Sequence, residues 1–369
     1  MRKVLILSGS LKTGGAEKMA QSIAIYGDTR RFEYHYLVFH PDPGEYEDKL
    51  CSLGCIVHRF PEPKENCFIF IRKLIHLLRC HNFQAVHAHT MFNCGIVMFC
   101  AWLCRIPVRI SHAHSSLSER RTIPHRIYES VMRLLILLFS TDRVACSRSA
   151  GNRLYGNRTF LLIPNGIDVH QYAYSEKARE TIRTSLQLKD SFVIGHIGRM
   201  VSVKNQIYLL NLMPKLLQQK PDAVLLLLGD GEDRFMLIKR IRQLDLSGKV
   251  ILAGNQADVS GYLSAMDVFV LPSLFEGMPL ALLEAQANGL PCVVSDTISG
   301  ESFVTNLVQP VSLNASAEDW MSAIVLSERK HPGQYCQMLQ KTPFSIGCSI
   351  AAIHRLYRKK HHDPHFVSD

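Results

Sequence analysis

The sequence predicts two successive α/β domains, each a doubly wound parallel sheet with helices on both faces. Three observations support this prediction. The chain has 369 residues, which is more than one hydrophobic core usually holds. Short apolar runs alternate with longer amphipathic segments, as strand–helix–strand units do. That alternation is interrupted once, near residues 165–190, by a turn signal and weakly patterned polar sequence.

Each expected strand of the first domain is a short apolar run. These runs lie at residues 3–7, 34–39, 56–59, 85–87, 108–111, 143–145 and 160–163. The amphipathic segments that we expect to be helical lie at 15–26, 68–80, 95–104, 124–139 and 148–155. Because strands alternate with helices, the strands should pair in parallel, and ligands should bind beyond their carboxyl ends.

The second domain repeats the alternation. Its expected strands lie at 192–197, 223–228, 250–252, 267–271 and 292–295, and its expected helices at 205–219, 233–244, 280–288 and 317–327. We therefore divide the chain into residues 1–170, 171–344 and 345–369. The last segment should form a helix with a basic end. The pattern alone does not place it, and packing against the first domain is one option.

The composition indicates a globular protein with an anionic partner. Hydrophobic residues make up 47% of the chain and charged residues 20%, which excludes a disordered protein. The formal net charge of +10 favours a nucleotide, a phosphate, a nucleic acid or an acidic membrane surface. The apolar runs fall well short of the roughly 20 residues that span a bilayer, so we expect a chain that does not cross a membrane.

The eleven cysteines are scattered and form no CxxC pair. Cys51 with Cys55, or Cys100 with Cys104, has helical spacing, but no histidine is spaced as a zinc partner would be. We expect reduced structural thiols in a cytoplasmic protein.

Residues 275–285 form the strongest candidate site. Glu276 lies in a turn marked by Gly277 and Pro279, and Glu284 lies on the helix expected to follow. Eight residues make about 2.2 helical turns, so both carboxylates can face one cleft. Helix-start N–H groups favour an anion, and carboxylates accept hydrogen bonds from sugar hydroxyls. A ligand that is part phosphate and part polyol would fit, whereas an ordinary turn with two surface acids is the simpler alternative.

Two other loops follow the first expected strand of each domain. Gly14 and Gly15 would let a ligand approach the backbone closely, although a plain tight turn would look the same. Arg199 and Lys204 lie where an anion would bind, and they suit phosphate oxygens. A solvated basic loop is the alternative there.

Two turns of the second domain are weaker candidates. Gly229-Asp230-Gly231 follows the strand at 223–228, and Asn255 follows the strand at 250–252. Their backbone and amide groups could line the same cleft and meet a nucleobase edge. Ordinary turns explain them equally well.

Two histidine pairs follow neighbouring expected strands. His112 and His114 would point the same way if their strand continues, and His87 and His89 form a similar pair. We find no third metal ligand at the usual spacing, so we expect no metal site. A histidine at such a strand end could instead bind a reacting sugar, and we interpret His87 and His89 as structural.

Together these segments resemble the retaining, nucleotide-sugar-dependent glycosyltransferases of family 4, which have the GT-B fold of two Rossmann-like domains facing across a cleft. The motifs that carry the resemblance are, in order, Gly14-Gly15-Ala16-Glu17, Gly198-Arg199 with Lys204-Asn205, Gly229-Asp230-Gly231, and Glu276-Gly277 with Glu284-Ala285. The resemblance covers nearly the whole chain. The sequence around 111–115 further resembles the branch that builds capsular and extracellular polysaccharides.

The resemblance implies roles for residues at the matching positions. Glu276 would hold the hydroxyls of the transferred sugar, helped by the backbone of Gly277, Met278, Pro279 and Leu280. Glu284 would bind the nucleotide ribose, while Arg199 and Lys204 would neutralise the departing diphosphate. Gly15, beside Gly14, would let the loop approach donor phosphate and acceptor. A histidine after the fifth strand would contact the donor sugar, and we favour His114 over His112.

The resemblance also implies the chemistry. The family has no metal-binding DxD motif, and this chain has none, so we expect no cofactor or metal beyond a nucleotide-sugar co-substrate, with UDP as the expected nucleotide. Configuration would be retained without a carboxylate nucleophile. A GT-B epimerase or hydrolase, or a non-catalytic glycan-binding subunit, is the alternative. A nucleic-acid partner is not expected, because no aromatic-interleaved basic patch occurs.

The acceptor side is less clear from the sequence. The segment 119–139 is basic, then amphipathic, then apolar, as an interfacial helix on anionic lipid would be. A core helix with a basic entry loop has the same pattern. On the membrane interpretation, a lipid-linked glycan acceptor would be met at the inner face of the cell membrane.

Overall fold

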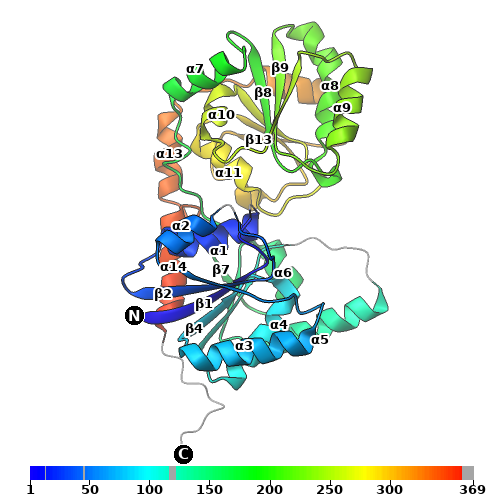
Figure 1. Ribbon diagram of the computed structural model, residues 1–369. Coiled ribbons are helices and arrows are strands. Elements are labelled where there is room, and N and C mark those ends of the chain that lie inside the picture. Colours follow the sequence, from blue (N-terminus) through cyan, green and yellow to red (C-terminus); the bar gives the residue numbers. More distant parts are fainter. Residues whose placement is uncertain (13, 45, 116–121, 360–369) are drawn as a thin grey trace, which may run out of the picture. The chain divides into compact units, whose positions relative to one another are not determined.

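The chain forms two compact units (Figure 1). The computed structural model describes residues 1–12, 14–44, 46–115 and 122–359. The first unit contains residues 1–166 together with the C-terminal segment from Ile346 onward, and the second contains residues 167–345. Each unit has a parallel sheet with helices on both faces, which confirms the predicted fold class.

In the first unit the described strands form one parallel sheet in the order β3-β2-β1-β4-β5-β6-β7. The strands are β1 Arg2–Ser8, β2 Phe32–Val38, β3 Ile56–Arg59, β4 Ala85–Ala88, β5 Val108–Ala113, β6 Asp142–Ala145 and β7 Leu161–Leu162. The helices are α1 Gly15–Ile25, α2 Glu47–Ser52, α3 Cys67–His81, α4 Cys94–Leu103, α5 Ile123–Phe139, α6 Arg148–Tyr155 and α14 Ile346–Arg358, with a short 3₁₀ turn at Met91–Asn93. The strand order reverses between β1 and β4, which is where ligands bind in such sheets.

The C-terminal helix α14 packs on this first sheet. Its buried side chains Ile350, Ile353 and Tyr357 share a core with β1, β2 and α1, while α3 and α4 cover the opposite face (Figure 1). The Arg2 guanidinium also donates to the Tyr357 carbonyl oxygen at 2.9 Å. The last turn carries Arg355 and Arg358, and residues 360–362 of the predicted basic end lie outside the described residues.

In the second unit the described strands form a parallel sheet in the order β10-β9-β8-β11-β12-β13. The strands are β8 Phe192–Ile197, β9 Ala223–Leu228, β10 Val250–Gly254, β11 Val268–Leu271, β12 Cys292–Ser295 and β13 Val308–Val311. The helices are α7 Glu176–Ser185, α8 Gln206–Gln219, α9 Arg234–Gln243, α10 Ser260–Ala265, α11 Leu280–Ala287, α12 Ala317–Val325 and α13 Gly333–Gln340, with 3₁₀ turns at Ser202–Lys204 and Gly300–Ser302. Here the order reverses between β8 and β11.

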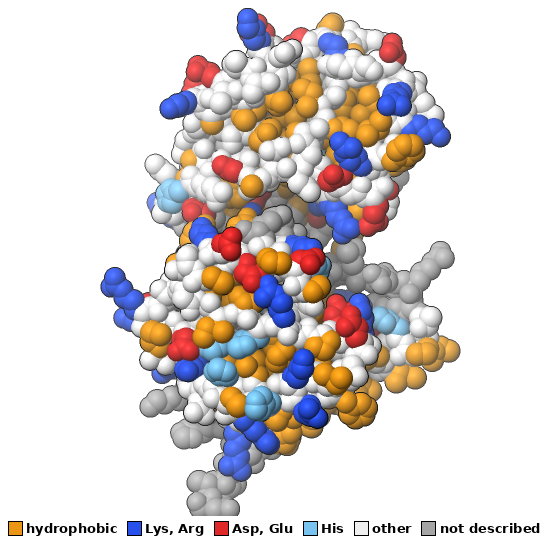
Figure 2. All heavy atoms as spheres, viewed as in Figure 1, with side chains coloured by type: hydrophobic (Ala, Val, Ile, Leu, Met, Phe, Trp, Pro, Cys, Tyr) orange, Lys and Arg blue, Asp and Glu red, His pale blue; other side chains and the backbone are white. Residues whose placement is uncertain are grey.

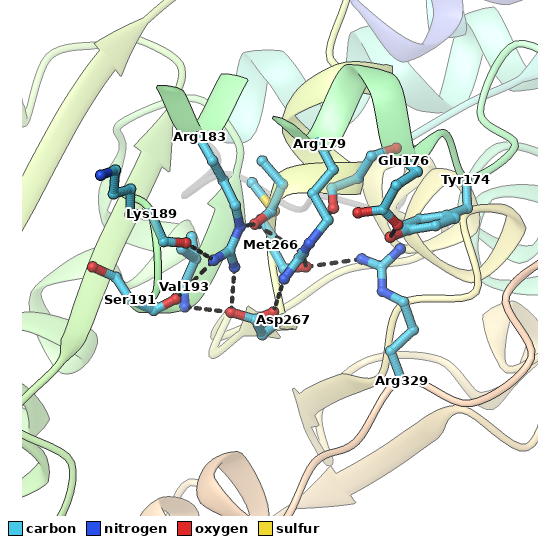
Figure 3. A network of polar contacts seen from close by, with 12 residues as sticks. Tyr174, Glu176, Arg179, Arg183, Lys189, Ser191, Val193, Met266, Asp267 and Arg329 are labelled. Carbon is cyan, nitrogen blue, oxygen red and sulfur yellow. Dashed lines mark hydrogen bonds and ion pairs between the residues drawn. The ribbon is translucent and has the colours of Figure 1, made fainter. Parts of the chain in front are cut away.

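Helix α7 is held to this sheet by a charged network rather than by an apolar face (Figure 3). Asp267 accepts hydrogen bonds from Arg179 and Arg183, both at 2.6 Å, and from the backbone N–H of Val193 at 2.7 Å. Arg329 donates to the Met266 carbonyl oxygen at 2.9 Å and lies over the Tyr174 ring. Burial lowers the pKa of Arg329 to about 10, so it stays charged at neutral pH.

The sequence interpretation missed several short elements. Helices α2, α7, α10 and α13 and the strand β13 were not expected. Helices of 6 to 10 residues span too few turns for a clear periodicity. β13 contains Pro310 and is a half-exposed edge strand, where a missing N–H is tolerated.

Candidate functional site

The predicted turn with the two glutamates follows β11, at the switch point of the second sheet. Glu276 is half-buried, and its carboxylate is paired with the Lys204 ammonium and accepts from the Ser273 hydroxyl at 3.0 Å. Its carbonyl oxygen accepts from the Ser299 N–H at 3.3 Å, which ties the turn to the segment after β12. The Glu276 carboxylate is therefore oriented by Lys204 and Ser273, while Ser299 holds the Glu276 backbone.

The start of α11 presents several backbone donors. Pro279 precedes the helix, and its carbonyl oxygen accepts from the N–H groups of Leu282 and Leu283. In the described part of the chain, the N–H groups of Gly277, Met278, Leu280 and Ala281 donate to no protein acceptor. Free amides at the positive end of a helix form an anion site. These unpaired N–H groups lie directly beside the Glu276 carboxylate, in an arrangement that suits an anion.

The basic loop after β8 lies against this turn. Lys204 ends a short 3₁₀ turn, and the Val203 carbonyl oxygen accepts from the Leu274 N–H at 2.8 Å. Asn205 has φ +55° and donates to the Pro272 carbonyl oxygen at 3.0 Å. The loops after β8 and β11 are therefore joined by backbone and side-chain hydrogen bonds as well as by the Lys204–Glu276 pair.

Arg199 extends further into solvent than Lys204. Its guanidinium donates to Glu232 at 2.7 Å, and both side chains are more than two-thirds exposed. This exposed pair is weak, so Arg199 is available to an anionic ligand at low cost.

Glycines let the loops after β8 and β9 pack backbone to backbone. Gly229 has φ +121°, and a Cβ there would lie 2.2 Å from the Gly198 carbonyl oxygen. A Cβ on Gly231 would lie 2.3 Å from the Met200 carbonyl oxygen. The Met200 N–H also donates to the Asp230 carbonyl oxygen at 2.9 Å. The glycine turn supports the basic loop.

Glu284 and Asn255 differ in their exposure to solvent. Glu284 is 4% exposed and lies on α11, two turns beyond Glu276. Asn255 follows β10 and is exposed. Both lie on segments that follow strands of the same sheet, as the sequence predicted.

His196 is a site residue that the sequence interpretation missed. It is fully buried at the end of β8, and its Nδ1 is 2.9 Å from the Val270 carbonyl oxygen. Its Nε2 has no partner among the described residues and would be 3.3 Å from a Cβ on Gly198. Burial lowers its pKa to about 4, and the nearby Lys204 lowers it further. A histidine just before Gly198-Arg199 was the available signal.

In the first unit, Gly14 and Gly15 lie at the start of α1, beyond the end of β1. A side chain on Gly15 would first meet the Asn165 amide nitrogen, at 4.0 Å, so space in front of the loop is open. Asn165 is buried and donates to the Gly15 carbonyl oxygen at 3.5 Å, and its Oδ1 has no partner among the described residues. Asn165 was not predicted.

The two histidine pairs meet at the ends of β4 and β5. His87 Nε2 lies 3.1 Å from His112 Nδ1, and His89 Nδ1 lies 2.7 Å from His114 Nε2. His112 is fully buried, whereas His114, just past the strand, is partly exposed. The structure brings His87, His89 and His112 together across two strands, a grouping that the spacing along the sequence did not indicate. Sequence spacing covers one strand and cannot show a ligand on its neighbour.

Burial keeps these histidines neutral. It holds the pKa of His87, His89 and His112 well below the usual value, and neighbouring histidines lower it further. Burial also lowers the pKa of His114 to about 4, while the nearby Asn165 side chain acts in the opposite direction. Neutral imidazoles can donate from one nitrogen and accept at the other.

Two further expectations concern the whole chain. All eleven cysteines are free thiols, as expected. No helix in the described ranges combines the length and the apolar character needed to cross a bilayer.

Family models match both halves of the chain. Residues 13–171 match the model described as Glycosyltransferase Family 4, and residues 178–322 match the model described as Glycosyl transferases group 1. The candidate loops after β8, β9 and β11 lie inside the second match.

Relatives named as glycosyltransferases agree with these matches. EpsF of Bacillus subtilis (strain 168), which is named as a glycosyltransferase, is 32% identical over 333 residues, 88% of this chain and 87% of its own. The capsular polysaccharide biosynthesis glycosyltransferase CapH of Staphylococcus aureus is 27% identical over 98% of this chain and 99% of its own. A UDP-Gal:alpha-D-GlcNAc-diphosphoundecaprenol alpha-1,3-galactosyltransferase of Escherichia coli is 32% identical over 63% of each chain.

A solved structure shows the same architecture. HepE of Anabaena, crystallised with UDP, superposes with a TM-score of 0.79, covering 96% of this chain and 99% of its own at 20% identity. At that identity the likeness shows the fold, which is GT-B. With EpsF similar along most of its length and both family models matched, the chain belongs to the family 4 glycosyltransferases.

Proposed function

We propose that the enzyme transfers a hexosyl group from a UDP-sugar to a glycan or lipid-linked glycan in surface polysaccharide biosynthesis, with retention of configuration. The observation that carries this proposal is the Lys204–Glu276 pair beside four free backbone amides at the start of α11. The amides and Lys204 suit a diphosphate, and the carboxylate suits sugar hydroxyls. Such a combination suits a nucleotide sugar.

Each candidate site residue of the second unit has a proposed role in binding the nucleotide-sugar donor. Glu276 accepts from the sugar hydroxyls, and the backbone N–H groups of Gly277, Met278 and Leu280 donate to the bound nucleotide sugar. Arg199 and Lys204 stabilise the charge that develops on the departing diphosphate. Glu284 binds the ribose, while Gly229 and Asn255 line the nucleotide. His196 is added because its buried Nε2, which has no partner among the described residues, lies beside Gly198.

For the first unit we propose that the Gly14-Gly15 loop meets phosphate and acceptor, and that His114 contacts the donor sugar. The partial exposure of His114 and its closeness to Asn165, which holds Gly15, support His114 over the fully buried His112.

The proposed reaction needs no enzymic nucleophile. The bond from the anomeric carbon to the diphosphate breaks through an oxocarbenium-like state, and the acceptor hydroxyl attacks from the same face while the departing phosphate takes its proton. Glu276 is occupied by Lys204 and sugar hydroxyls rather than acting as the nucleophile of a retaining hydrolase. The E. coli relative forms an alpha linkage from UDP-Gal, the outcome expected of retention because UDP-galactose is an α-glycoside.

The acceptor is proposed to be lipid-linked and met at the inner face of the cell membrane. Helix α5 exposes an apolar stripe, with Ile123 at 74%, Ile127 at 59%, Leu134 at 55% and Leu138 at 60% exposure (Figure 2). These residues repeat at helical spacing on one side of an amphipathic helix, as in interfacial helices. Exposed Arg126 and, on α3, Arg72 and Lys73 supply positive charge for anionic lipid. The segment 119–121, which contains the basic residues Arg120 and Arg121 of the sequence argument, lies outside the described residues.

Calorimetry tests the donor site. Lys204→Ala should weaken UDP binding about tenfold or more, because a partly buried charge-assisted contact contributes about 1.5–3 kcal/mol. The matched control is Lys215→Ala, which breaks the exposed Lys215–Glu318 pair on helices α8 and α12 and should leave the affinity unchanged.

Titrations in EDTA test the metal-free part of the proposal, since wild-type affinity for UDP should persist there. Equal affinity in Lys204→Ala and wild type would refute the role of Lys204. Loss of UDP binding in EDTA that Mn²⁺ restores would refute the metal-free diphosphate site.

A further inference from the structure

We propose that His87, His89 and His112 form a binding site for a divalent transition-metal ion of the Zn²⁺ class. The site lies at the carboxyl ends of β4 and β5 in the first unit. None of its three ligands belongs to the diphosphate site on the second unit, although His89 lies in hydrogen-bond contact with His114, the proposed sugar contact.

The three side chains already converge. One ligand nitrogen from each lies within 4.8 Å of the others. His87 Nε2 and His112 Nδ1 are 3.1 Å apart, close to the roughly 3.3 Å that separates two nitrogens bound to one tetrahedral zinc at about 2.0 Å each. The third nitrogen lies within 4.8 Å of the other two, so it has to approach further to reach that separation.

The third ligand nitrogen is free. His89 Nδ1 is engaged with His114 Nε2 at 2.7 Å, and His89 Nε2 has no partner among the described residues although it is buried. A buried polar nitrogen without a partner costs free energy. A metal ion that takes the lone pair of His89 Nε2 removes that cost.

Two of the three outer nitrogens have the partners that metal-bound histidines need, whereas His112 Nε2 has none among the described residues. His87 Nδ1 lies 2.7 Å from the Tyr357 hydroxyl of α14, which is buried. His89 Nδ1 can donate in the same way to His114 Nε2. Bonds of this kind fix the tautomer in which the other nitrogen carries a lone pair, and they orient the ring toward the ion.

The ligand set selects the ion. Three imidazoles without a carboxylate suit Zn²⁺, Co²⁺, Ni²⁺ or Cu²⁺, and they do not suit Mg²⁺ or Ca²⁺, which prefer oxygen. Among the described residues no fourth histidine, cysteine or carboxylate joins the group. A fourth position would then be held by water, as in three-histidine zinc sites. Metal binding would replace the His87–His112 hydrogen bond and add a further link between the paired strands β4 and β5.

A second histidine group provides a matched control. His35 Nδ1 lies 3.0 Å from His58 Nε2, and the His81 ring is 5.8 Å from that of His58. In this group the other nitrogen of His35 is engaged by Glu33 at 2.9 Å. It therefore has histidines at similar distances without the three converging nitrogens.

The experiment titrates the untagged full-length chain with Co²⁺, after alkylation of the exposed thiols, and follows visible absorption, with Zn²⁺ competition. Wild type and His58→Gln should bind one ion with the intense bands of a tetrahedral nitrogen site, and Zn²⁺ should raise the Tm of both. His89→Gln should weaken binding about 100-fold or more, and Tyr357→Phe about tenfold, because outer partners contribute roughly 10–100-fold.

Circular dichroism of the metal-free variants checks that each is folded. If His89→Gln is not, Tyr357→Phe and the wild-type stoichiometry decide. The proposal is overturned if wild type binds no Co²⁺, if binding is unchanged in His89→Gln or in Tyr357→Phe, or if it is lost in His58→Gln.

Discussion

Single glycines decide how the donor loops are shaped. Gly229 combines a left-handed backbone with a Cβ position 2.2 Å from the Gly198 carbonyl oxygen, so no other residue fits without displacing the Arg199 loop. The sequence could indicate a turn at Gly229, because glycine after a strand marks one. It could not show that this turn packs against the loop after β8.

Gly229→Ala should lower UDP affinity about tenfold and destabilise the protein by about 1–3 kcal/mol beyond the cost of backbone strain, because backbone atoms must move. Gly248→Ala is the control, since Gly248 also has positive φ, at +78°, but no atom within 4 Å of a Cβ. Gly248→Ala should lose about 1 kcal/mol and keep its UDP affinity. Isothermal calorimetry and urea unfolding measure both effects. Equal UDP affinity in the two variants would contradict the supporting role of Gly229.

The candidate site residues could be predicted from the chemical type of their side chains. The contacts that these side chains make with residues distant in the sequence could not. Glu276, Lys204 and Arg199 stand out as charged residues just past apolar strands. The pairing of Lys204 with Glu276 joins residues 72 positions apart, which no local pattern contains. The same holds for His196, whose partner is a carbonyl oxygen on β11.

At the scale of secondary structure, α5 and α7 show two ways of attaching a helix. Helix α5 was predicted from its apolar periodicity, and it exposes part of that apolar surface. Helix α7 was missed, because its sequence is charged and its attachment depends on Asp267, 84 residues from Arg183. Helices held by apolar faces can be predicted from sequence, whereas helices held by distant ion pairs cannot.

The exposed face of α5 predicts binding to anionic vesicles. Replacing Ile127 and Leu134 together by Ser should weaken partitioning onto phosphatidylglycerol vesicles tenfold or more, because each such side chain contributes about 1.5 kcal/mol or more when buried. The control replaces Phe235 and Leu326 by Ser; these are 79% and 78% exposed on the second unit. Vesicle co-sedimentation measures both. Equal loss in the two variants, or binding to neutral phosphatidylcholine as strong as to phosphatidylglycerol, would count against the α5 surface.

At the scale of the whole molecule, buried neutral histidines predict acid sensitivity. Burial lowers the pKa of His196 to about 4, against about 6.5 in the unfolded chain. The folded state therefore binds fewer protons, so stability falls as the pH drops from about 6.5 toward about 4, by about 1.4 kcal/mol per pH unit. His196→Gln keeps a donor for Val270 and should flatten this slope. His331→Gln, at an exposed position, should not. Urea midpoints across this pH range measure the slope, and identical slopes in wild type and His196→Gln would contradict it.

The two-domain architecture of the chain could be predicted from its sequence. The contacts between segments that are distant in the sequence could not. Both sheets follow from strand–helix alternation, because that pattern permits parallel pairing only. The return of α14 to the first sheet rests on contacts such as Tyr357 with His87, which are 270 positions apart. The three-histidine group likewise depends on two strands lying side by side.

The most direct test of the account is the transfer activity of Glu276→Ala beside Glu318→Ala. Both carboxylates pair with a lysine, but only Glu276 adjoins the free amides of α11. With a panel of UDP-sugars and an undecaprenyl-diphosphate-linked acceptor, wild type and Glu318→Ala should release UDP and form product. Glu276→Ala should remain folded and lose at least 100-fold in rate, about 2.7 kcal/mol of transition-state stabilisation. Full activity in Glu276→Ala would contradict the assignment of this turn as the donor-sugar site.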